Sequence, residues 1–320
     1  MKTLKRYNTI LLLIFFCANL LFNFTVSAQQ KNPFHLNKVI QLFEEGKPAF
    51  GLFSLDRSPR NAIVISESDL DYVFIDMEHA PWDINSLQLF LYSMINKREI
   101  LAKGNPQPNV VPIVRIPANG AEKKEYMIKQ VLDRGAYGII SPHIDTPEQA
   151  RELVQACRYP QENNAQDYYP EGLRGAAGTP APRYWGITLP EYIKKADAWP
   201  LDPSGELLVI IQIESKQAVE NINEIIDVPG ISAAFIGPFD LSFSLGYPAD
   251  TSAPPVENAM QKVLKACLAK NIPCGITAGP DDIEKRLKEG FKLIAFHGLD
   301  GGPSTLVVEG LRVAREFLKY

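Results

Sequence analysis

Eight short apolar runs alternate with longer amphipathic stretches along the chain, and this alternation constrains the fold more than any other feature. Each run is too short for a typical helix and rich in β-branched or aromatic residues, as strands buried on both faces of a parallel sheet are. The runs cover residues 48–55, 72–78, 110–116, 138–143, 207–214, 233–240, 272–278 and 292–297. Eight strands alternating with helices predict one (β/α)8 TIM barrel, an α/β fold. An open doubly wound sheet is the alternative, but it would need a Gly-rich loop after the first strand.

The stretches between the runs supply the predicted helices. Four of them are predicted at residues 121–134, 146–157, 215–226 and 255–270. Thr146-Pro147 and Ser215 are typical residues for a helix start. Two polar stretches, residues 95–109 and 159–172, contain Pro, Gly and Asn and are predicted to be exposed loops, because the alternation resumes after each.

The first 28 residues have the pattern of a secretory signal peptide: a basic start, an apolar centre and small residues near the end. A transmembrane anchor fits less well, because the apolar run is short and contains Asn19 and Asn23. We therefore expect cleavage after residue 28, with residues 29–320 forming the barrel and residues 29–40 an N-terminal extension. The protein would be exported, periplasmic or secreted, without stable membrane association after cleavage.

The composition, 46% hydrophobic and 22% charged, is typical of a globular protein. Residues 1–28 hold three basic residues and no acidic ones, so the remainder has 30 basic and 37 acidic residues and a net charge of −7. No basic block remains, which argues against nucleic acid as a partner. Cys157, Cys267 and Cys274 form neither a disulfide framework nor a zinc site. Cys267 and Cys274 are predicted to be small apolar residues of a helix and the following strand.

Side chains suited to catalysis stand at or near the ends of four runs, where the carboxyl ends of barrel strands build active sites. These side chains are Asp76, Glu78, His79, Arg115, Gln212, Glu214 and Asp240. Glu214 and Asp240 would lie at adjacent strand ends, where they could bind one hard cation such as Mg²⁺ or Mn²⁺. The alternative is two ordinary acids that cap the helices after their strands. The N–H groups of Phe239 and Asp240, after the Gly237-Pro238 turn, could face an anionic substrate.

His79 is the candidate base, because it shares a barrel face with these acidic residues. His143, which ends the fourth run, competes for that role, and His297 ends the eighth run. Arg115 could bind an oxyanion or a carboxylate through its planar donors, or pair with the neighbouring acids. No run ends in lysine, which disfavours an aldolase that works through a Schiff base.

The segments IDMEHAPWD, VRIP, DRGAYGIISP, GLRG, QIE and IGPFDLSFSLG occur in the order seen in the metal-dependent (class II) pyruvate aldolases, and the chain resembles that family over about residues 48–300. The family includes the 2-dehydro-3-deoxyglucarate and 4-hydroxy-2-oxoheptanedioate aldolases and is more distantly related to the citrate lyase β subunit. The resemblance implies a carbon–carbon lyase that reversibly cleaves a 2-keto-3-deoxy or 4-hydroxy-2-oxo acid to pyruvate and an aldehyde, through a metal-stabilised pyruvate enolate.

The resemblance also implies roles for individual residues. Glu214 and Asp240 match the ligands of Mg²⁺ or Mn²⁺, and Co²⁺ also fits. His79 matches the general base and Arg115 the group that stabilises the oxyanion. The residues implied in substrate binding are Gln212, Gly237, Pro238, Phe239 and Asp240, and Asp76 belongs to the catalytic set.

Asp133 matches an aspartate that supports the histidine of a neighbouring subunit, which implies a homo-oligomer, a hexamer by the family pattern. Two alternatives remain open at this point. One is a related oxaloacetate decarboxylase or CoA-thioester lyase. The other is an exported, non-catalytic 2-keto-acid-binding protein, against which the complete His, Arg, Glu and Asp set argues.

Overall fold

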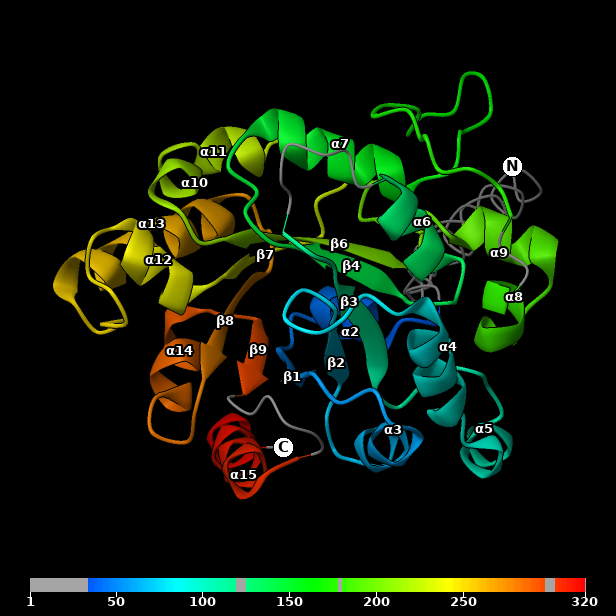
Figure 1. Ribbon diagram of the computed structural model, residues 1–320, viewed down its shortest axis with the longest axis horizontal. Coiled ribbons are helices and arrows are strands. Elements are labelled where there is room, and N and C mark those ends of the chain that lie inside the picture. Colours follow the sequence, from blue (N-terminus) through cyan, green and yellow to red (C-terminus); the bar gives the residue numbers. More distant parts are fainter. Residues whose placement is uncertain (1–33, 119–124, 178–179, 297–302, 320) are drawn as a thin grey trace, which may run out of the picture. The chain divides into compact units, whose positions relative to one another are not determined.

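Eight parallel strands close into a barrel in the computed structural model of the chain (Figure 1). The structure describes residues 34–118, 125–177, 180–296 and 303–319, so the predicted signal peptide and His297 lie outside the described residues. The barrel belongs to a unit that spans His35–Tyr320. Within the described ranges, no helix combines the length and apolarity needed to cross a bilayer.

Each predicted run contains one strand, which confirms the single (β/α)8 barrel. The strands are β1 (Ala49–Ser54), β2 (Tyr72–Asp76), β3 (Val111–Arg115), β4 (Gly138–Ser141), β6 (Leu207–Ile213), β7 (Ala233–Ile236), β8 (Cys274–Ala278) and β9 (Leu293–Phe296). The ring closes because β1 pairs with both β2 and β9, while β4 pairs with β6. A two-residue strand, β5 (Ala198–Trp199), pairs with β6 outside this ring and was not predicted from the sequence.

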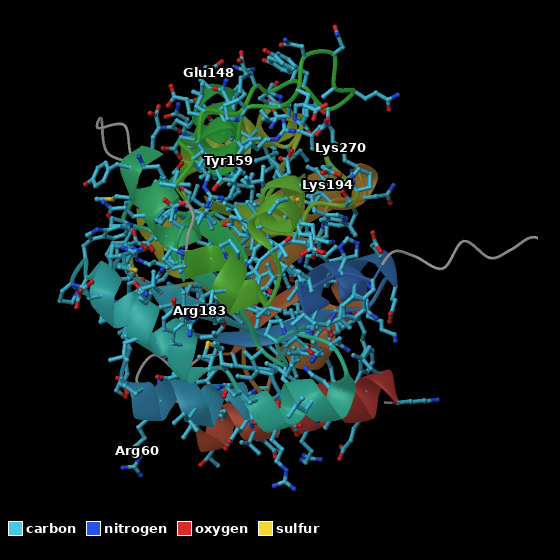
Figure 2. The ribbon with its side chains drawn as sticks, turned by 90° about the vertical axis from the view of Figure 1, so that its right-hand side faces the viewer. Arg60, Glu148, Tyr159, Arg183, Lys194 and Lys270 are labelled. Atoms are coloured by element: carbon cyan, nitrogen blue, oxygen red, sulfur yellow. The ribbon has the colours of Figure 1, made fainter. Side chains whose placement is uncertain are left out.

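Helices surround the strands in Figure 1. They are α2 (Lys38–Glu44), α3 (Pro59–Ser66), α4 (Ile84–Ser93), α5 (Lys97–Lys103), α6 (Glu125–Leu132), α7 (Pro147–Cys157), α8 (Pro180–Trp185), α9 (Leu189–Lys195), α10 (Lys216–Glu220), α11 (Ile222–Ile225), α12 (Pro238–Ser244), α13 (Pro254–Ala269), α14 (Ile283–Glu289) and α15 (Thr305–Leu318). Charged side chains such as Arg60 and Glu148 point outward from this layer (Figure 2).

Both predicted helix starts are confirmed. Thr146 closes a capping box with Gln149 at the start of α7, and the Ser215 hydroxyl accepts the N–H of Ala218 at the start of α10. The stretch 215–226 is nevertheless two helices rather than one. The break falls at Asn221, which ends α10 and precedes α11, and the Asn221 side chain donates to the Asp145 carbonyl at 2.9 Å.

The prediction that residues 95–109 form a loop was wrong. They contain α5, which begins where the Asn96 side chain accepts the N–H groups of Arg98 and Glu99, and ends at Gly104. Gly104 has a φ of 69°, a left-handed conformation that glycine adopts without a steric penalty. The prediction for residues 159–172 is confirmed, since they contain neither helix nor strand.

Aromatic side chains fill the interior of the barrel. Phe53 of β1, Phe74 of β2 and Phe235 of β7 contact one another. The ring centroid of Phe53 lies 4.8 Å from that of Phe74 and 5.7 Å from that of Phe235, and the centroids of Phe74 and Phe235 are 5.5 Å apart. All strand residues that form β1, β2, β6 and β7 are buried. The barrel is therefore a packed core, and a ligand site can form only at its ends. Cys267 and Cys274 lie buried and free in α13 and β8, as predicted.

The segment before α2 is attached to the amino end of the barrel through a buried carboxylate. Glu206 accepts the Asn37 N–H at 2.9 Å and lies 3.3 Å from Nδ1 of His35. Burial alone would lower the pKa of His35, but Glu206 and Glu44 more than offset this effect and raise the pKa above its ordinary 6.5. The part of the predicted N-terminal extension that is described thus packs as an integral piece of the barrel.

This contact predicts a pH-dependent contribution to stability. A histidine whose pKa is raised by folding stabilises the fold below its unfolded pKa, and the contribution is lost as pH rises through the folded pKa. His35→Gln should therefore lower the free energy of unfolding at pH 6 by about 1–3 kcal/mol, the range for a buried hydrogen bond to a charged group. The deficit should shrink at pH 9, as measured by urea denaturation at both values. A deficit that is equal at both pH values would contradict the prediction.

Candidate active site

A cavity of about 600 Å³ opens at the carboxyl ends of the strands. That volume falls within the range of small-molecule sites. Its walls come from loops and strands all around the barrel. The lining residues are Phe53, His79, Arg115, Gln212, Phe235, Gly237, Pro238, Phe239, Asp240, Ala249, Thr251, Met260, Ile276, Thr277, Asp282 and Arg286.

Arg115 is held in this cavity by Asp76. The two residues are register partners at the ends of β3 and β2, and the Arg115 guanidinium donates to both Asp76 carboxylate oxygens, through Nε at 3.0 Å and through a terminal nitrogen. Asp76 is fully buried, and its carboxylate also accepts the N–H groups of Glu78 and His79. The Arg115 guanidinium lies 4.5 Å from the Phe53 ring. A bidentate pair of this kind fixes the direction of the arginine side chain.

Glu78 links Arg115 to His79. Its carboxylate lies 3.2 Å from a terminal nitrogen of Arg115 and 3.6 Å from Nε2 of His79. Burial raises the pKa of Glu78, while the charges of Arg115 and His79 act in the opposite direction. The His79 side chain is 61% exposed, so its imidazole is accessible to a substrate in the cavity.

Glu214 lies just beyond β6 and is almost fully buried, with 2% exposure. Its carboxylate accepts hydrogen bonds from Nε2 of Gln212 and, at 2.9 Å, from the backbone N–H of His143. Nδ1 of His143 lies 3.6 Å from the same carboxylate. Burial raises the pKa of Glu214 to about 7, and the charges of Asp240 and Glu78 add to the effect, which His143 partly opposes. Glu214 is therefore a desolvated carboxylate that also experiences the negative charges of two other acidic residues.

The prediction that Asp240 closes a strand was wrong. β7 ends at Ile236, Gly237 is the N-cap of α12, and Asp240 is an exposed residue in the first turn of that helix. The apolar run continues past the strand because Pro238 and Phe239 begin the helix, and periodicity cannot separate the two over so few residues. The Asp240 carboxylate still lines the cavity.

Gly237 allows the chain to pass close to Glu214. A Cβ at this position would overlap Oε2 of Glu214 and would lie 3.0 Å from Nε2 of Gln212. Oε1 of Gln212 is buried and has no hydrogen-bond partner among the described residues. A buried acceptor without a partner, beside a desolvated carboxylate, is typical of a site built for a ligand or a cation. The hard oxygens of Glu214 and Asp240 fit a divalent ion such as Mg²⁺ or Mn²⁺.

Asp133 does not join this cavity within one chain. It follows α6 and precedes β4, which places it toward the amino ends of the strands, and its carboxylate accepts a hydrogen bond from Arg174 at 2.8 Å. Arg174, from the GLRG segment, is buried and stacks on Tyr159, with its guanidinium 4.4 Å from the ring. The assignment of Asp133 to a neighbouring subunit's site stays a prediction.

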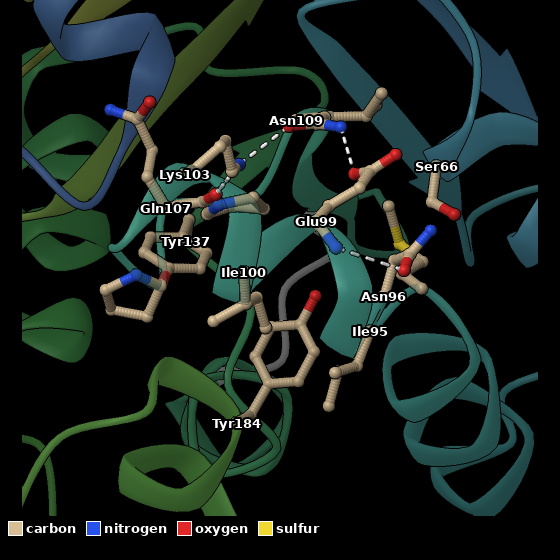
Figure 3. A pocket seen from close by; sticks show the side chains of 14 residues that line it. Ser66, Ile95, Asn96, Glu99, Ile100, Lys103, Gln107, Asn109, Tyr137 and Tyr184 are labelled. Carbon is tan, nitrogen blue, oxygen red and sulfur yellow. Dashed lines mark hydrogen bonds between the residues drawn. The ribbon is translucent and has the colours of Figure 1, made fainter.

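Two other places in the described part of the chain could be mistaken for sites. Asp167, Asp197 and Asp202 bring carboxylate oxygens within 4.8 Å of one another, but buried Arg158 already pairs with Asp167 and Asp197. A cavity of about 40 Å³ lies near the amino ends of β3 and β4, beside Tyr184 (Figure 3). It has room for only a few water molecules.

Several lining residues were missed by sequence reasoning. Phe53 and Phe235 lie inside apolar runs and gave no signal of their own. Thr277 is a polar residue near the end of the seventh run, a signal that could have been used. Asp282 and Arg286 lie beyond that run, at and within α14, and only the folded chain brings them to the cavity.

Comparison with known proteins gives one consistent result. The family model described as HpcH/HpaI aldolase/citrate lyase matches residues 49–304. The 2-keto-3-deoxy-L-rhamnonate aldolase of Klebsiella pneumoniae is 34% identical over 252 residues, which is 78% of this chain and 82% of that protein. The hydroxypyruvate/pyruvate aldolase of Roseobacter denitrificans is 31% identical over 265 residues, 82% of this chain and 91% of that protein.

The solved structures agree with this result. A HpcH/HpaI aldolase/citrate lyase family protein from Burkholderia cenocepacia superposes with a TM-score of 0.68 at 29% identity, covering 88% of this chain and 98% of that one. The matched segment, the barrel and the cavity at its carboxyl end lead to the same conclusion: the chain belongs to the HpcH/HpaI aldolase/citrate lyase family and is a carbon–carbon lyase.

Proposed function

We propose that this protein is a divalent-metal-dependent aldolase that reversibly cleaves a 2-keto-3-deoxy or 4-hydroxy-2-oxo acid to pyruvate and an aldehyde. The observation that carries the proposal is the buried Glu214 carboxylate, which leaves no room for a Cβ at Gly237 and lies beside Gln212, whose Oε1 has no partner among the described residues. Glu214 and Asp240 would hold Mg²⁺, Mn²⁺ or Co²⁺. When bound, the cation supplies a Lewis acid and a counter-charge for the oxygens of a 2-oxo acid.

The chain's own residues surround the place where that acid would bind. The N–H groups of Phe239 and Asp240, in the first turn of α12, are donors for its carboxylate, and Pro238 has no N–H to offer. Gln212 and Gly237 shape the pocket beside Glu214.

Cleavage then requires one proton acceptor and one fixed positive charge. His79 accepts the proton of the substrate's 4-hydroxyl group as the bond between C3 and C4 breaks, and the electron pair of that bond forms the enolate of pyruvate. Arg115, fixed by Asp76, places positive charge at the developing enolate oxygen. Protonation of the enolate at C3 completes pyruvate, and the other fragment leaves as the aldehyde.

The proposal is tested by exchange of the methyl protons of pyruvate in deuterated water, followed by NMR. Protein treated with EDTA should show no enzymatic exchange, and addition of Mg²⁺ or Mn²⁺ should restore it. Full exchange after EDTA treatment would rule out the metal-dependent mechanism. Binding of pyruvate without exchange in metal-loaded protein would instead favour a non-catalytic 2-keto-acid-binding protein.

We further propose that residues 1–28 direct export and that the mature chain assembles into a homo-oligomer. The composition of residues 1–28 supports the first statement. Placement of Asp133 away from the cavity of its own chain is compatible with a role at a neighbour's site. N-terminal sequencing of the exported protein and sedimentation analysis test the two statements separately.

A further inference from the structure

The cavity extends beyond the groups assigned to pyruvate, and its far wall comes from other elements. Thr277 of β8, Asp282 before α14 and Arg286 of α14 line this wall. In the ring of strands, β8 lies next to β7 and directly across the barrel from β3, which carries Arg115. The floor between the two sides is apolar, formed by Phe53 and Ile276 among others. A substrate longer than pyruvate can therefore reach the far wall.

The arginine of this wall, and the lysine next to it in the chain, are already paired with carboxylates. Arg286 donates to Glu257 through both terminal nitrogens, at 2.8 and 3.0 Å, and to Glu289 at 3.1 Å, while its Nε lies 3.6 Å from Asp282. Lys285 lies 3.3 Å from Glu257. The hydrogen bonds from Arg286 lower the pKa of Glu257 to about 2, so Glu257 is ionised at neutral pH. Arg286 and Lys285 are thus paired with three carboxylates, those of Glu257, Glu289 and Asp282.

The remaining polar groups of the wall suit hydroxyl groups. The Thr277 hydroxyl can both donate and accept a hydrogen bond, and Asp282 is a carboxylate acceptor with 42% of its side chain exposed. One Asp282 oxygen accepts the Gly279 N–H at 2.7 Å, which holds the side chain in place. A second carboxylate on the substrate would meet like charge here, with no unpaired cation in the described part of the wall.

We propose that this wall binds the aldehyde half of the substrate and selects neutral hydroxyaldehydes over aldehydes that carry a second carboxylate. The inference rests on the proposed aldolase function and specifies the class of its second product. Its parts are the hydroxyl of Thr277, the carboxylate of Asp282 and the guanidinium of Arg286, whose terminal nitrogens already donate to Glu257 and Glu289.

The test is aldol addition of pyruvate, with Mg²⁺ present, to erythrose and to succinic semialdehyde, two aldehydes of equal chain length. Erythrose is neutral and hydroxylated, whereas succinic semialdehyde carries a carboxylate. The kcat/KM for erythrose should be higher by about tenfold or more, because a site that matches polar groups strongly rejects an analogue that leaves them unpaired. An equal value, or a higher one for succinic semialdehyde, would overturn the inference.

Two variants probe the wall directly. Asp282→Asn removes the charge but keeps an oxygen that can accept the Gly279 N–H. The ratio of kcat/KM for erythrose to kcat/KM for succinic semialdehyde should fall by about fivefold or more, chiefly because kcat/KM for succinic semialdehyde rises. Thr277→Val should raise KM for erythrose by about fivefold and leave kcat nearly unchanged. Glu284→Gln is the matched control, an exposed carboxylate of the same helix that pairs with Lys288, and it should leave the preference unchanged.

Pyruvate proton exchange, measured on the same samples, distinguishes failure of the proposed aldehyde selectivity from failure of the proposed aldolase function. Normal exchange in both wall variants, together with the altered preference, supports the inference, since the pyruvate half of the site then works. Normal exchange with an unaltered preference in Asp282→Asn overturns the inference alone. Absence of exchange in the metal-loaded wild-type protein overturns the proposed function and the inference with it.

Discussion

Replacement of Glu214 by glutamine is expected to abolish metal-dependent exchange of pyruvate protons, with a rate loss of about 10³-fold or more. Glutamine keeps the shape of the side chain and removes the negative charge that a divalent cation requires. Lewis-acid stabilisation of an enolate amounts to several kcal/mol, and each 1.4 kcal/mol corresponds to about tenfold in rate. NMR exchange at saturating Mn²⁺, with calorimetric titration of Mn²⁺, measures both the rate and the affinity.

Thermal unfolding of Glu214→Gln shows whether a loss of exchange comes from loss of the fold or from loss of the metal ligand. Burial raises the pKa of Glu214 to about 7, so its ionised form destabilises the metal-free fold at higher pH. Glu214→Gln without metal should then unfold at pH 8 at a temperature equal to or above that of the wild-type protein. Glu220→Gln, an exposed carboxylate that follows on α10, is the matched control and should leave exchange unchanged. Wild-type Mn²⁺ affinity and exchange in Glu214→Gln would rule out the proposed ligand.

The barrel could be predicted because strands buried on both faces leave almost continuous apolar runs. β6 is the clearest case, since all seven of its residues are buried. The error at residues 95–109 has a local cause: the polar composition concealed a helix set by one capping side chain and one glycine, Asn96 and Gly104. Capping positions depend on single residues rather than on a periodic pattern, so the composition of a segment does not reveal them.

The candidate site was predictable where a polar residue interrupts or ends an apolar run, as Arg115 and Glu214 do. What the sequence could not provide was strand register. The pairing of Asp76 with Arg115 follows from their opposition across β2 and β3, and the contact between Glu214 and the His143 N–H joins residues 71 positions apart. Close packing is equally invisible in a sequence: Gly237 is required because Glu214 fills the space of a Cβ.

His79→Asn is expected to reduce kcat for retro-aldol cleavage by about 10²- to 10⁴-fold, the range for removal of a general base. His79 lines the cavity, and its side chain is largely exposed. Among the described residues, the side chain makes one ion-pair contact, with Glu78. The affinity for pyruvate and Mn²⁺ should therefore remain close to that of the wild-type protein. Single-turnover cleavage assays and calorimetry measure the two quantities separately.

His143→Asn is the discriminating partner of this experiment, because His143 is the competing base. The backbone N–H of His143 donates a hydrogen bond to the Glu214 carboxylate at 2.9 Å, and this bond does not depend on the side chain at position 143. Its φ of 51° lies in the left-handed region, which asparagine tolerates well, so the variant should fold. We expect a loss of less than about tenfold, the effect of a side chain that neighbours the site without accepting the proton. A larger loss of kcat in His143→Asn, together with a normal cleavage rate in His79→Asn, would show that His143 accepts the proton. The carboxylate next to the base would then be Glu214 rather than Glu78.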